Sequence, residues 1–430
     1  MKFTAVGDMI IQKRVFEDYL GFDELAPFIK EGDARFFNLE TTLNYEGQAS
    51  VSQFSGGTYL RCDPRILEDI KPFGFNMTSF NNNHALDYFY DGLESTLVEV
   101  QNSGLVHAGV GRNLAEASAP RYLETPNGRV ALIAVNTTFS APMMAGEQSP
   151  RVKGRPGING IRVSTYVELP REELEYVKKL ADEVGINNSK NIIRREGYYD
   201  YLPDDEAEFG DLVFKLGEKK AYKMKANAED VARVEKAIYE AQLQADYIII
   251  SIHSHQIDGD AKEQPAKFYE ELCRHFIDKG AHAVVGHGPH LLRPVEIYNG
   301  RPIFYSLGDF IVQLYNVEFA PEDFFRKHGL DSSYTVHDLL KKRSRGFTVG
   351  LMEDSRMFRS VIPQWETDEN GNLTSLKFMP VEMSMKGNKS ENGLPRRSYN
   401  PEIFEYFKNM CEPYGTRLEL DADGIIHCIL

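Results

Sequence analysis

The sequence predicts a layered α/β fold, and two patterns support this. Short apolar runs, as compact as buried strands tend to be, alternate along the chain with segments of helical periodicity. Several runs end in a short polar cluster, which is typical of strands that carry side chains to a ligand site at the carboxyl edge of a sheet. The chain has 430 residues, 42% of them hydrophobic, so one large domain with embellishments can bury a sizeable core.

The expected elements follow the order of a sheet with helical connections. Strands are predicted at 3–6, 34–39, 76–79, 130–135, 247–252, 283–285 and 303–306. Helices are predicted at 64–70, where a proline suits the first turn, and at 91–101 and 229–244, where apolar residues recur at helical spacing.

The C-terminal part is expected to contain two hairpins. Alternating runs at 346–351 and 373–379 flank a turn at 368–372 and predict the first β-hairpin. Beyond it we expect a polar loop at 386–400, a helix at 401–410 and a short hairpin around Asp423 and Gly424. These assignments divide the chain into a main domain at 1–385 and a C-terminal loop, helix and hairpin at 386–430 that pack on it.

Residues 162–245 do not continue the alternation of apolar runs with helical segments, because they are highly charged and rich in tyrosine. A helix is predicted at 170–185 and a loop with aromatic side chains at 198–203, so the segment is expected to be a helical insertion. Two interpretations stay open: a solvated excursion, or a lid that covers the site and helps to select the substrate.

Charge and cysteine content narrow the class of protein. The formal net charge of −15 argues against a nucleic-acid partner, because such binders need clustered Lys and Arg. Four cysteines without CxxC spacing predict reduced, structural thiols. No signal-peptide hydrophobic region follows Met1 and no apolar run approaches the roughly 18 residues of a membrane span, so we expect a cytoplasmic protein.

Five polar clusters follow the apolar runs and supply carboxylate, carboxamide and imidazole groups. They contain Asp8, Glu40, Asn83 with His84, His253 with His255, and His287 with His290. Borderline divalent metals accept these ligands, so the sequence indicates a metal-dependent hydrolase framework.

Single members of the clusters have simpler explanations. Asp8 also suits a turn or a helix cap, and any one histidine could be a satisfied core residue. Glu40 is harder to explain in this way, because a buried carboxylate needs a salt bridge or a metal. His253 and His255 would share one face of an extended strand, which favours a common ligand.

Four segments resemble a known family. They are 37–41 (FNLET), 82–87 (NNHALD), 286–290 (GHGPH) and 305–310 (YSLGDF). Taken in order, they resemble the capsule-biosynthesis CapA (PgsA) branch of the calcineurin-like metallophosphoesterases, which is linked to poly-γ-glutamate. The resemblance covers roughly residues 1–382. It implies a four-layer αββα sandwich, with two sheets face to face, helices outside, and a two-metal centre between the layers.

The resemblance also assigns roles by position. Asp8, Glu40 and His290 would meet the first metal, and Glu40 would bridge to a second metal held by Asn83, His253 and His287. His84 would be a general acid or transition-state stabiliser, oriented by Asp87. A water activated by the two metals would be the nucleophile of an in-line displacement.

Ile10 departs from the family pattern, because it stands where an imidazole is expected and an aliphatic side chain cannot ligate. Either only one metal binds tightly, or His255 or Asp309 supplies the missing donor. The expected cofactor is therefore one or two divalent ions of Mn, Zn, Fe, Co or Ni. Glu40 replaces the usual bridging Asp and adds one methylene of reach.

We expect an anionic small-molecule or polymer substrate, and Arg293, close after the GHGPH loop, is a candidate to bind it. The first hypothesis is a hydrolase that attacks a phosphoester or a γ-glutamyl-type amide with metal-activated water. The alternative is a non-catalytic, metal-stabilised accessory or binding protein of capsule polymer synthesis. A nucleic acid is not an expected partner, no membrane segment is expected, and the sequence leaves the oligomeric state open.

Overall fold

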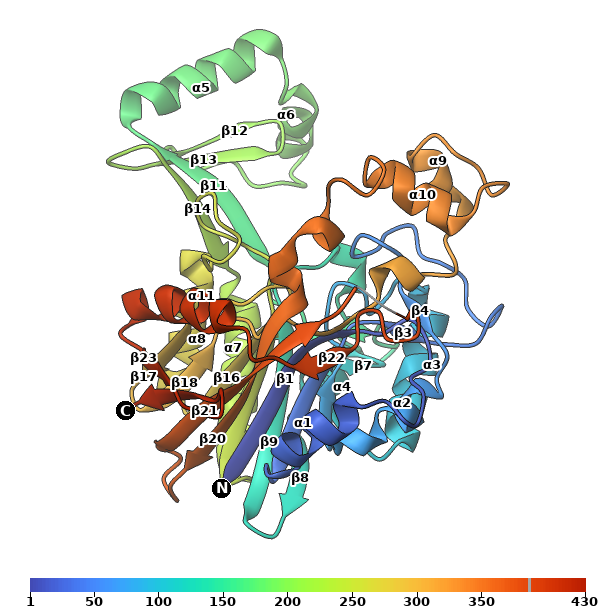
Figure 1. Cartoon of the computed structure of the whole chain (residues 1–430). Coiled ribbons are helices and arrows are strands. Elements are labelled where there is room, and N and C mark those ends of the chain that lie inside the picture. The colour runs from blue at the N-terminus through green and yellow to red at the C-terminus, as the bar shows by residue number, and fades with distance from the viewer. Residues whose placement is uncertain (386–387) are drawn as a thin grey trace. The chain divides into compact units, whose positions relative to one another are not determined.

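A computed structural model of the chain describes residues 1–385 and 388–430 (Figure 1). These residues divide into two compact units: Met1–Ile161 together with Asp230–Leu430, and Arg162–Glu229. The first unit mixes helices with parallel and antiparallel strands, which confirms the predicted α/β class.

The larger sheet of the first unit has ten strands among the described residues. Its order is β23 (Arg417–Leu420), β24 (Ile426–Ile429), β21 (Leu373–Met383), β20 (Arg359–Thr367), β1 (Lys2–Ile10), β2 (Ala34–Leu39), β5 (Met77–Ser79) and β6 (Val106–Ala108). Two short strands join it, β19 (Asp309–Val312) beside β1 and β22 (Pro395–Arg397) beside β21. Four neighbouring strands, β1, β2, β5 and β6, run parallel, so their carboxyl ends meet at one edge of the sheet.

The second sheet has six strands among the described residues. Its order is β17 (Val295–Tyr298), β18 (Arg301–Phe304), β16 (Ala283–His287), β15 (Tyr247–His253), β9 (Gly128–Asn136) and β8 (Arg121–Thr125). The four inner strands are parallel. Every one of the seven predicted strands overlaps an observed strand of these two sheets.

The two sheets share a hydrophobic core. Phe36 of β2 packs in one cluster with Leu132 of β9 and Ile249 of β15, whereas its neighbour Phe37 belongs to the cluster that contains Leu25 of helix α1 (Gly21–Lys30). Successive side chains of a strand point to opposite faces. The ten-stranded sheet is therefore buried on both faces, one against the other sheet and one against helices.

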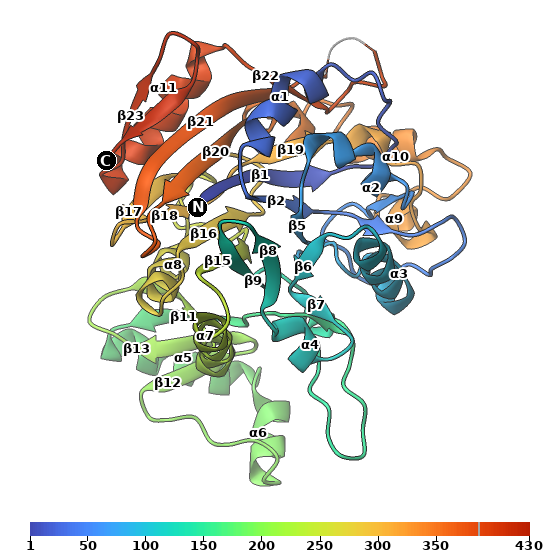
Figure 2. The same cartoon turned by 90° about the horizontal axis from the view of Figure 1, so that it is seen from below.

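The helices flank the sheets, as Figure 2 shows, with α1 and α2 beside the ten-stranded sheet and α7 and α8 beside the six-stranded one. Their bounds are α1 (Gly21–Lys30), α2 (Ile66–Asp69), α3 (Phe89–Asn102), α4 (Leu114–Ser118), α7 (Ala228–Gln242), α8 (Lys267–Asp278), α9 (Glu322–Lys327), α10 (Val336–Arg343) and α11 (Pro401–Cys411). Two strand pairs complete the unit, β3 (Thr42–Leu43) with β4 (Arg61–Cys62) and β7 (Val110–Gly111) with β10 (Gly157–Ile158).

The second unit is not the helical insertion that the sequence predicts. It contains α5 (Arg171–Val184) and α6 (Asn188–Arg195), but also a four-stranded sheet of β12 (Glu206–Phe209), β13 (Leu212–Leu216), β11 (Val163–Leu169) and β14 (Ala221–Ala226). Polar and charged residues stand between the apolar residues of β11 and β14, so no apolar run marks these strands in the sequence. The unit ends at Glu229, and most of α7 belongs with the first unit.

The first predicted hairpin is shifted along the chain. Its turn at 368–372 is confirmed, but the partner of β21 is β20, and residues 346–351 form turns and the start of a 3₁₀ segment. Gly346 and Phe347 have positive φ angles of 79° and 60°, which are incompatible with a strand. Within the predicted 386–400 loop, residues 386–387 lie outside the described part of the chain. Residues 395–397 form strand β22 instead of a loop.

Two further predictions concern features of the whole chain. Cys62, Cys273, Cys411 and Cys428 are all free thiols, as expected. Among the described residues, no helix is both long and apolar enough to span a bilayer.

Candidate functional site

Candidate site residues gather where the parallel strands of both large sheets end. In the ten-stranded sheet, Asp8 of β1 lies beside Asn38 of β2, which lies beside Ser79 of β5. In the six-stranded sheet, His253 of β15 lies beside His287 of β16. The polar clusters of the sequence thus form two rows, one at the carboxyl edge of each sheet, as expected for a ligand site.

Asp8 connects the two rows. Its Oδ2 accepts a hydrogen bond from the backbone N–H of Gly288 at 2.9 Å, and its Oδ1 accepts one from the side-chain amide of Asn38 at 2.7 Å. The preceding Gly7 lies against the Gly308 backbone, and a Cβ on Gly7 would be 1.8 Å from the Gly308 carbonyl oxygen. Glycine at position 7 therefore lets β19 come alongside β1 and bring Asp309 next to Asp8.

Asp8, His290 and Asp309 form the first of two ligand sets, which we call the Asp8 group. One ligand atom from each lies within 4.8 Å of the others. The Nδ1 of His290 is 3.0 Å from Asp309 Oδ1 and 3.8 Å from Asp8 Oδ2. His290 has a φ of 62°, a left-handed conformation that is uncommon for a residue other than glycine and that often marks a functional site.

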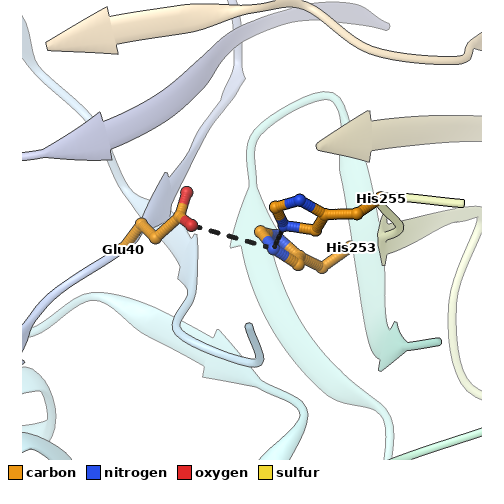
Figure 3. Close-up of side chains that lie close together, drawn as sticks. All are labelled: Glu40, His253 and His255. Atoms are coloured by element: carbon orange, nitrogen blue, oxygen red, sulfur yellow. Dashed lines mark hydrogen bonds and ion pairs between the residues drawn. The ribbon is translucent and has the colours of Figure 1, made fainter. Parts of the chain in front are cut away.

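Glu40, His253 and His255 form the second set, which we call the Glu40 group (Figure 3). Glu40 follows the last residue of β2, and its carboxylate points toward the imidazoles at the end of β15. The Nε2 of His253 is 3.0 Å from His255 Nε2, 2.8 Å from Asn83 Oδ1 and 3.8 Å from Glu40 Oε1. Four candidate ligand atoms thus converge on one small volume.

The carboxylate of Glu40 is fully buried, yet neither of its oxygens accepts a hydrogen bond from a described residue. Imidazole nitrogens of His84, His253 and His290 surround Oε1 at 3.8–3.9 Å, beyond hydrogen-bonding distance. Burying an unpaired carboxylate lowers the stability of the fold by roughly several kcal/mol, whereas a cation at this position would satisfy both oxygens. The arrangement fits a metal ligand.

His287 is also buried, and neither of its ring nitrogens has a hydrogen-bond partner among the described residues. The resemblance assigns it to the second metal with Asn83 and His253. In the structure its nearest carboxylate is Asp8, at 3.7 Å from Nδ1 to Oδ1. The distribution of ligands between two metals stays a prediction.

His84 and Asp87 are paired as expected, with 2.6 Å between Nδ1 and Asp87 Oδ2. Asp87 is fixed in turn by the backbone N–H groups of Gly56 at 3.2 Å and Leu60 at 2.8 Å. Gly56 lies so close that a Cβ there would be 2.5 Å from His84 Nε2. The loop over His84 therefore requires a glycine, a constraint that the sequence alone does not reveal.

The three consecutive asparagines separate into two roles. Asn81 donates to the backbone carbonyls of Ala134 and Asn159, and Asn82 donates to that of Leu39, so both fix the loop. Only Asn83 directs its side-chain oxygen at His253. Local loop building, which the sequence leaves open for all three, thus accounts for two of them.

Burial and mutual repulsion act on the carboxyl groups. Burial raises the pKa of Asp8 to about 6. It also raises the pKa of Glu40 well above its usual value, and the charges of Asp8 and Asp309 add to this effect. The pKa of Asp309 is raised well above its usual value by burial. Without a cation, these carboxylates disfavour one another's ionised forms.

The histidines respond in the opposite direction. Burial lowers the pKa of His287 to about 3 and lowers the pKa of His253 and of His255 well below the usual value. These imidazoles therefore stay neutral at pH 7 and keep a lone pair for a ligand.

A cavity opens beside the two groups. His84, His255 and His290 line it, and so does Ile10, the residue that replaces an expected imidazole. The side chain of Ile10 thus faces the site without offering a ligand atom.

Arg293 does not have the position expected of a substrate residue. Its side chain is fully buried and donates to the backbone carbonyls of Lys262 at 3.0 Å, Gln256 at 3.0 Å and Ser254 at 3.4 Å. It is absent from the described cavity lining and instead holds the loop that follows β15. Two cations that the sequence reasoning missed, Lys262 and Arg343, line the cavity. Arg343 is far from the motifs in sequence, so only the fold relates it to the site.

Comparison with known proteins gives a consistent family. Residues 2–314 match the family described as bacterial capsule synthesis protein PGA_cap. The uncharacterized protein y4sH of Sinorhizobium fredii is 31% identical over 98% of this chain and 92% of its own length. The PGA biosynthesis protein CapA of Bacillus subtilis is 23% identical over 67% of this chain and 56% of its own.

Two further similarities are weaker. The probable polyglutamine synthesis accessory protein Rv0574c of Mycobacterium tuberculosis is 22% identical over 65% of this chain and 55% of its own. A solved structure of a hypothetical protein from Thermus thermophilus has a TM-score of 0.41 at 12% identity, covering 89% of this chain and 99% of that one. A score this low supports no argument about fold or function.

Proposed function

Because this chain belongs to the PGA_cap family of bacterial capsule synthesis proteins, we propose that it is a metal-dependent hydrolase of a phosphoester or a γ-glutamyl-type amide. The observation that carries the proposal is the fully buried, unpaired carboxylate of Glu40 facing neutral imidazoles. We propose further that the two sheets and their outer helices are a four-layer αββα sandwich of the metallophosphoesterase type.

The residues present fit one or two divalent ions. The Asp8 group and the Glu40 group each offer carboxylate and imidazole donors within 4.8 Å of one another, and Asn83 and His287 add further donors beside them. Mixed oxygen and nitrogen donors suit Mn, Zn, Fe, Co or Ni. When bound, such ions would lower the pKa of a water molecule and polarise the oxygen of the scissile group.

The protein groups around this centre have separable tasks. Asp8, held by Asn38 and Gly288, keeps a fixed orientation. Asp87 accepts the Nδ1–H of His84, which leaves Nε2 directed toward Glu40. In its doubly protonated form, His84 can donate the Nε2 proton to the leaving oxygen or nitrogen while the oxygen of a hydroxide, formed when water loses one proton to solvent, bonds to phosphorus or carbon. The bond to the leaving group then breaks without leaving an unstable anion.

A second candidate function is a non-catalytic, metal-stabilised accessory role in capsule polymer synthesis. Two observations favour it. Ile10 brings an aliphatic side chain to the cavity where an imidazole would complete the first set of ligands. A relative from Mycobacterium tuberculosis is also described as an accessory protein of polyglutamine synthesis. In this role the metal would stabilise the fold without turnover.

One experiment separates the two functions. The chain is purified without chelators, its metal content is measured by elemental analysis, and hydrolysis of bis(p-nitrophenyl) phosphate, p-nitrophenyl phosphate and γ-glutamyl p-nitroanilide is assayed with added Mn, Zn or Ni. We expect bound metal with turnover of one bond class. Metal without turnover would favour the accessory role, and absence of metal after reconstitution would refute both.

A further inference from the structure

The cavity beside the two ligand groups has a charge opposite to that of the whole chain. The sequence contains 64 Asp and Glu residues against 49 Lys and Arg. Among the residues described for the cavity lining, however, no Asp or Glu occurs, and the permanently charged side chains are those of Lys262 and Arg343. A cationic lining in an acidic protein points to selection for an anionic ligand.

Arg343 is held in place without being neutralised. It is the last residue of α10, its Nη1 donates to Thr58 Oγ1 at 2.5 Å, and its Cζ lies 5.6 Å from the centre of the Phe324 ring. In the described part of the chain, no carboxylate lies within 4.0 Å of its guanidinium. By contrast, Arg356 is paired with Asp354 at 2.6 Å. Arg343 therefore keeps donors for a ligand.

Lys262 reaches the cavity from the loop that Arg293 fixes. The backbone carbonyl of Lys262 accepts a hydrogen bond from Arg293 Nε at 3.0 Å. Among the described residues its ammonium group has no ion-pair partner within 4.0 Å, and Lys262 lines the same cavity as His290. The buried Arg293 is thus a positioning residue, and Lys262 carries the charge to the cavity.

From this arrangement we infer that Lys262 and Arg343 bind an anionic group of the substrate, either a phosphate or a carboxylate. This group lies next to the bond that the substrate presents to the Asp8 group and the Glu40 group. The inference rests on the proposed function and deepens it by naming the substrate class. A γ-glutamyl polymer has a carboxylate on the carbon beside each amide nitrogen, and a phosphomonoester has additional anionic oxygens. Both present the oxygen pair that a guanidinium recognises.

The test removes each charge while keeping an unbranched side chain at the position. The variants are Lys262→Met and Arg343→Met, with Arg343→Lys as the conservative replacement. Lys341→Met is the matched control, because Lys341 lies on the same helix, is exposed and is not among the described cavity lining. Binding of tri-γ-glutamate and of inorganic phosphate to the metal-loaded protein is measured by calorimetry. KM and kcat are measured with γ-glutamylglutamate and with its derivative in which the α-carboxylate of the leaving glutamate is a methyl ester.

We expect each Met variant to weaken anion binding about tenfold, the effect of losing one charge-assisted hydrogen bond, and Lys341→Met to leave it unchanged. Arg343→Lys should recover part of the loss. With an active enzyme, KM for the free carboxylate should rise while kcat and the KM of the ester stay near their original values. Tighter binding of tri-γ-glutamate than of phosphate would identify the carboxylate source, and the reverse would identify the phosphate.

Failure of this inference can be told from failure of the hydrolase proposal. Turnover with equal anion binding in all variants would overturn the inference and leave the hydrolase intact. Anion binding that weakens in both Met variants, without turnover of any probe, would support the inference and count against catalysis. A wild-type protein that binds neither anion would overturn the inference.

Discussion

The Asp8 group and the Glu40 group differ in how their buried carboxylates are hydrogen-bonded. Asp8 is fully buried, but Asn38 and Gly288 donate hydrogen bonds to both of its oxygens, and His290 is hydrogen-bonded to Asp309. Glu40 is equally buried and receives no hydrogen bond from a described residue. The protein itself therefore supplies hydrogen bonds to much of the first group, whereas the second group contains a buried carboxylate that receives none from the described residues. We expect the metal requirement to be strongest at Glu40.

Glu40→Ala should have the largest effect. Because this carboxylate faces the imidazoles of the second group and lies 3.8 Å from His290 of the first, its loss should remove at least one metal ion. Removing a side chain that is hydrogen-bonded to a metal ligand typically lowers metal affinity or activity about 10–100-fold. Removing the ligand itself should therefore lower turnover by roughly 100-fold or more. Elemental analysis and probe hydrolysis measure this. The control is Glu46→Ala, an exposed carboxylate, and unchanged metal content in Glu40→Ala would refute the assignment.

His84→Ala should separate catalysis from metal binding. His84 lies 3.9 Å from Glu40 but belongs to neither ligand group, so the variant should keep its metal and lose about 10²–10⁴ in kcat, the usual contribution of a general acid. Asp87→Asn should lose less, because the ring remains. A His84→Ala enzyme with the full rate would rule out the acid role.

Asp309→Asn should affect the Asp8 group alone. The substitution keeps the volume of the side chain but replaces the carboxylate that faces His290 with a neutral amide. We expect affinity for one ion to fall roughly 10–100-fold while the ion at Glu40 is retained. Titration of the metal-free protein with Mn or Zn, followed by calorimetry, resolves the two sites. Equal weakening of both sites would show that the groups act as one.

Asp8→Asn tests the smallest expected effect, which is a pH dependence of stability. Burial raises the pKa of Asp8 to about 6 from the usual 3.8, so the stabilising contribution of its protonated form is complete below pH 4 and is lost as the pH rises through 6. In metal-free protein, the stability of Asp8→Asn relative to wild type should therefore be greater at pH 7 than at pH 4 by up to about 3 kcal/mol. Urea unfolding of both proteins at both pH values measures this, and a relative stability that is the same at pH 4 and pH 7 would contradict the explanation.

The sequence predicted the parts of the fold that depend on local patterns. Residues 34–39 form β2 with the predicted bounds, because a short and largely apolar segment that leads into a polar cluster has few alternatives as a buried strand. The convergence of His253, His287 and Asp8 could be expected for the same reason, since all follow or end such strands.

Features that depend on distant segments could not be predicted in this way. Arg293 is adjacent to a motif in sequence but is turned into the core, whereas Arg343 reaches the cavity from α10. The sheet of the second unit was missed because its strands are half exposed and rich in charge, so no apolar run marks them. Gly56 was missed because its necessity comes from His84, not from its neighbours in the chain.

The position of β1 has a consequence for how the protein is made. This first strand pairs with β2, which is synthesised soon after it, but also with β19 and β20, which leave the ribosome hundreds of residues later. Contacts of such sequence separation form slowly, because the intervening chain must be closed first. A nascent chain that ends before Asp309 lacks part of the Asp8 group, so during translation the edge of β1 stays unpaired and the site cannot yet be complete.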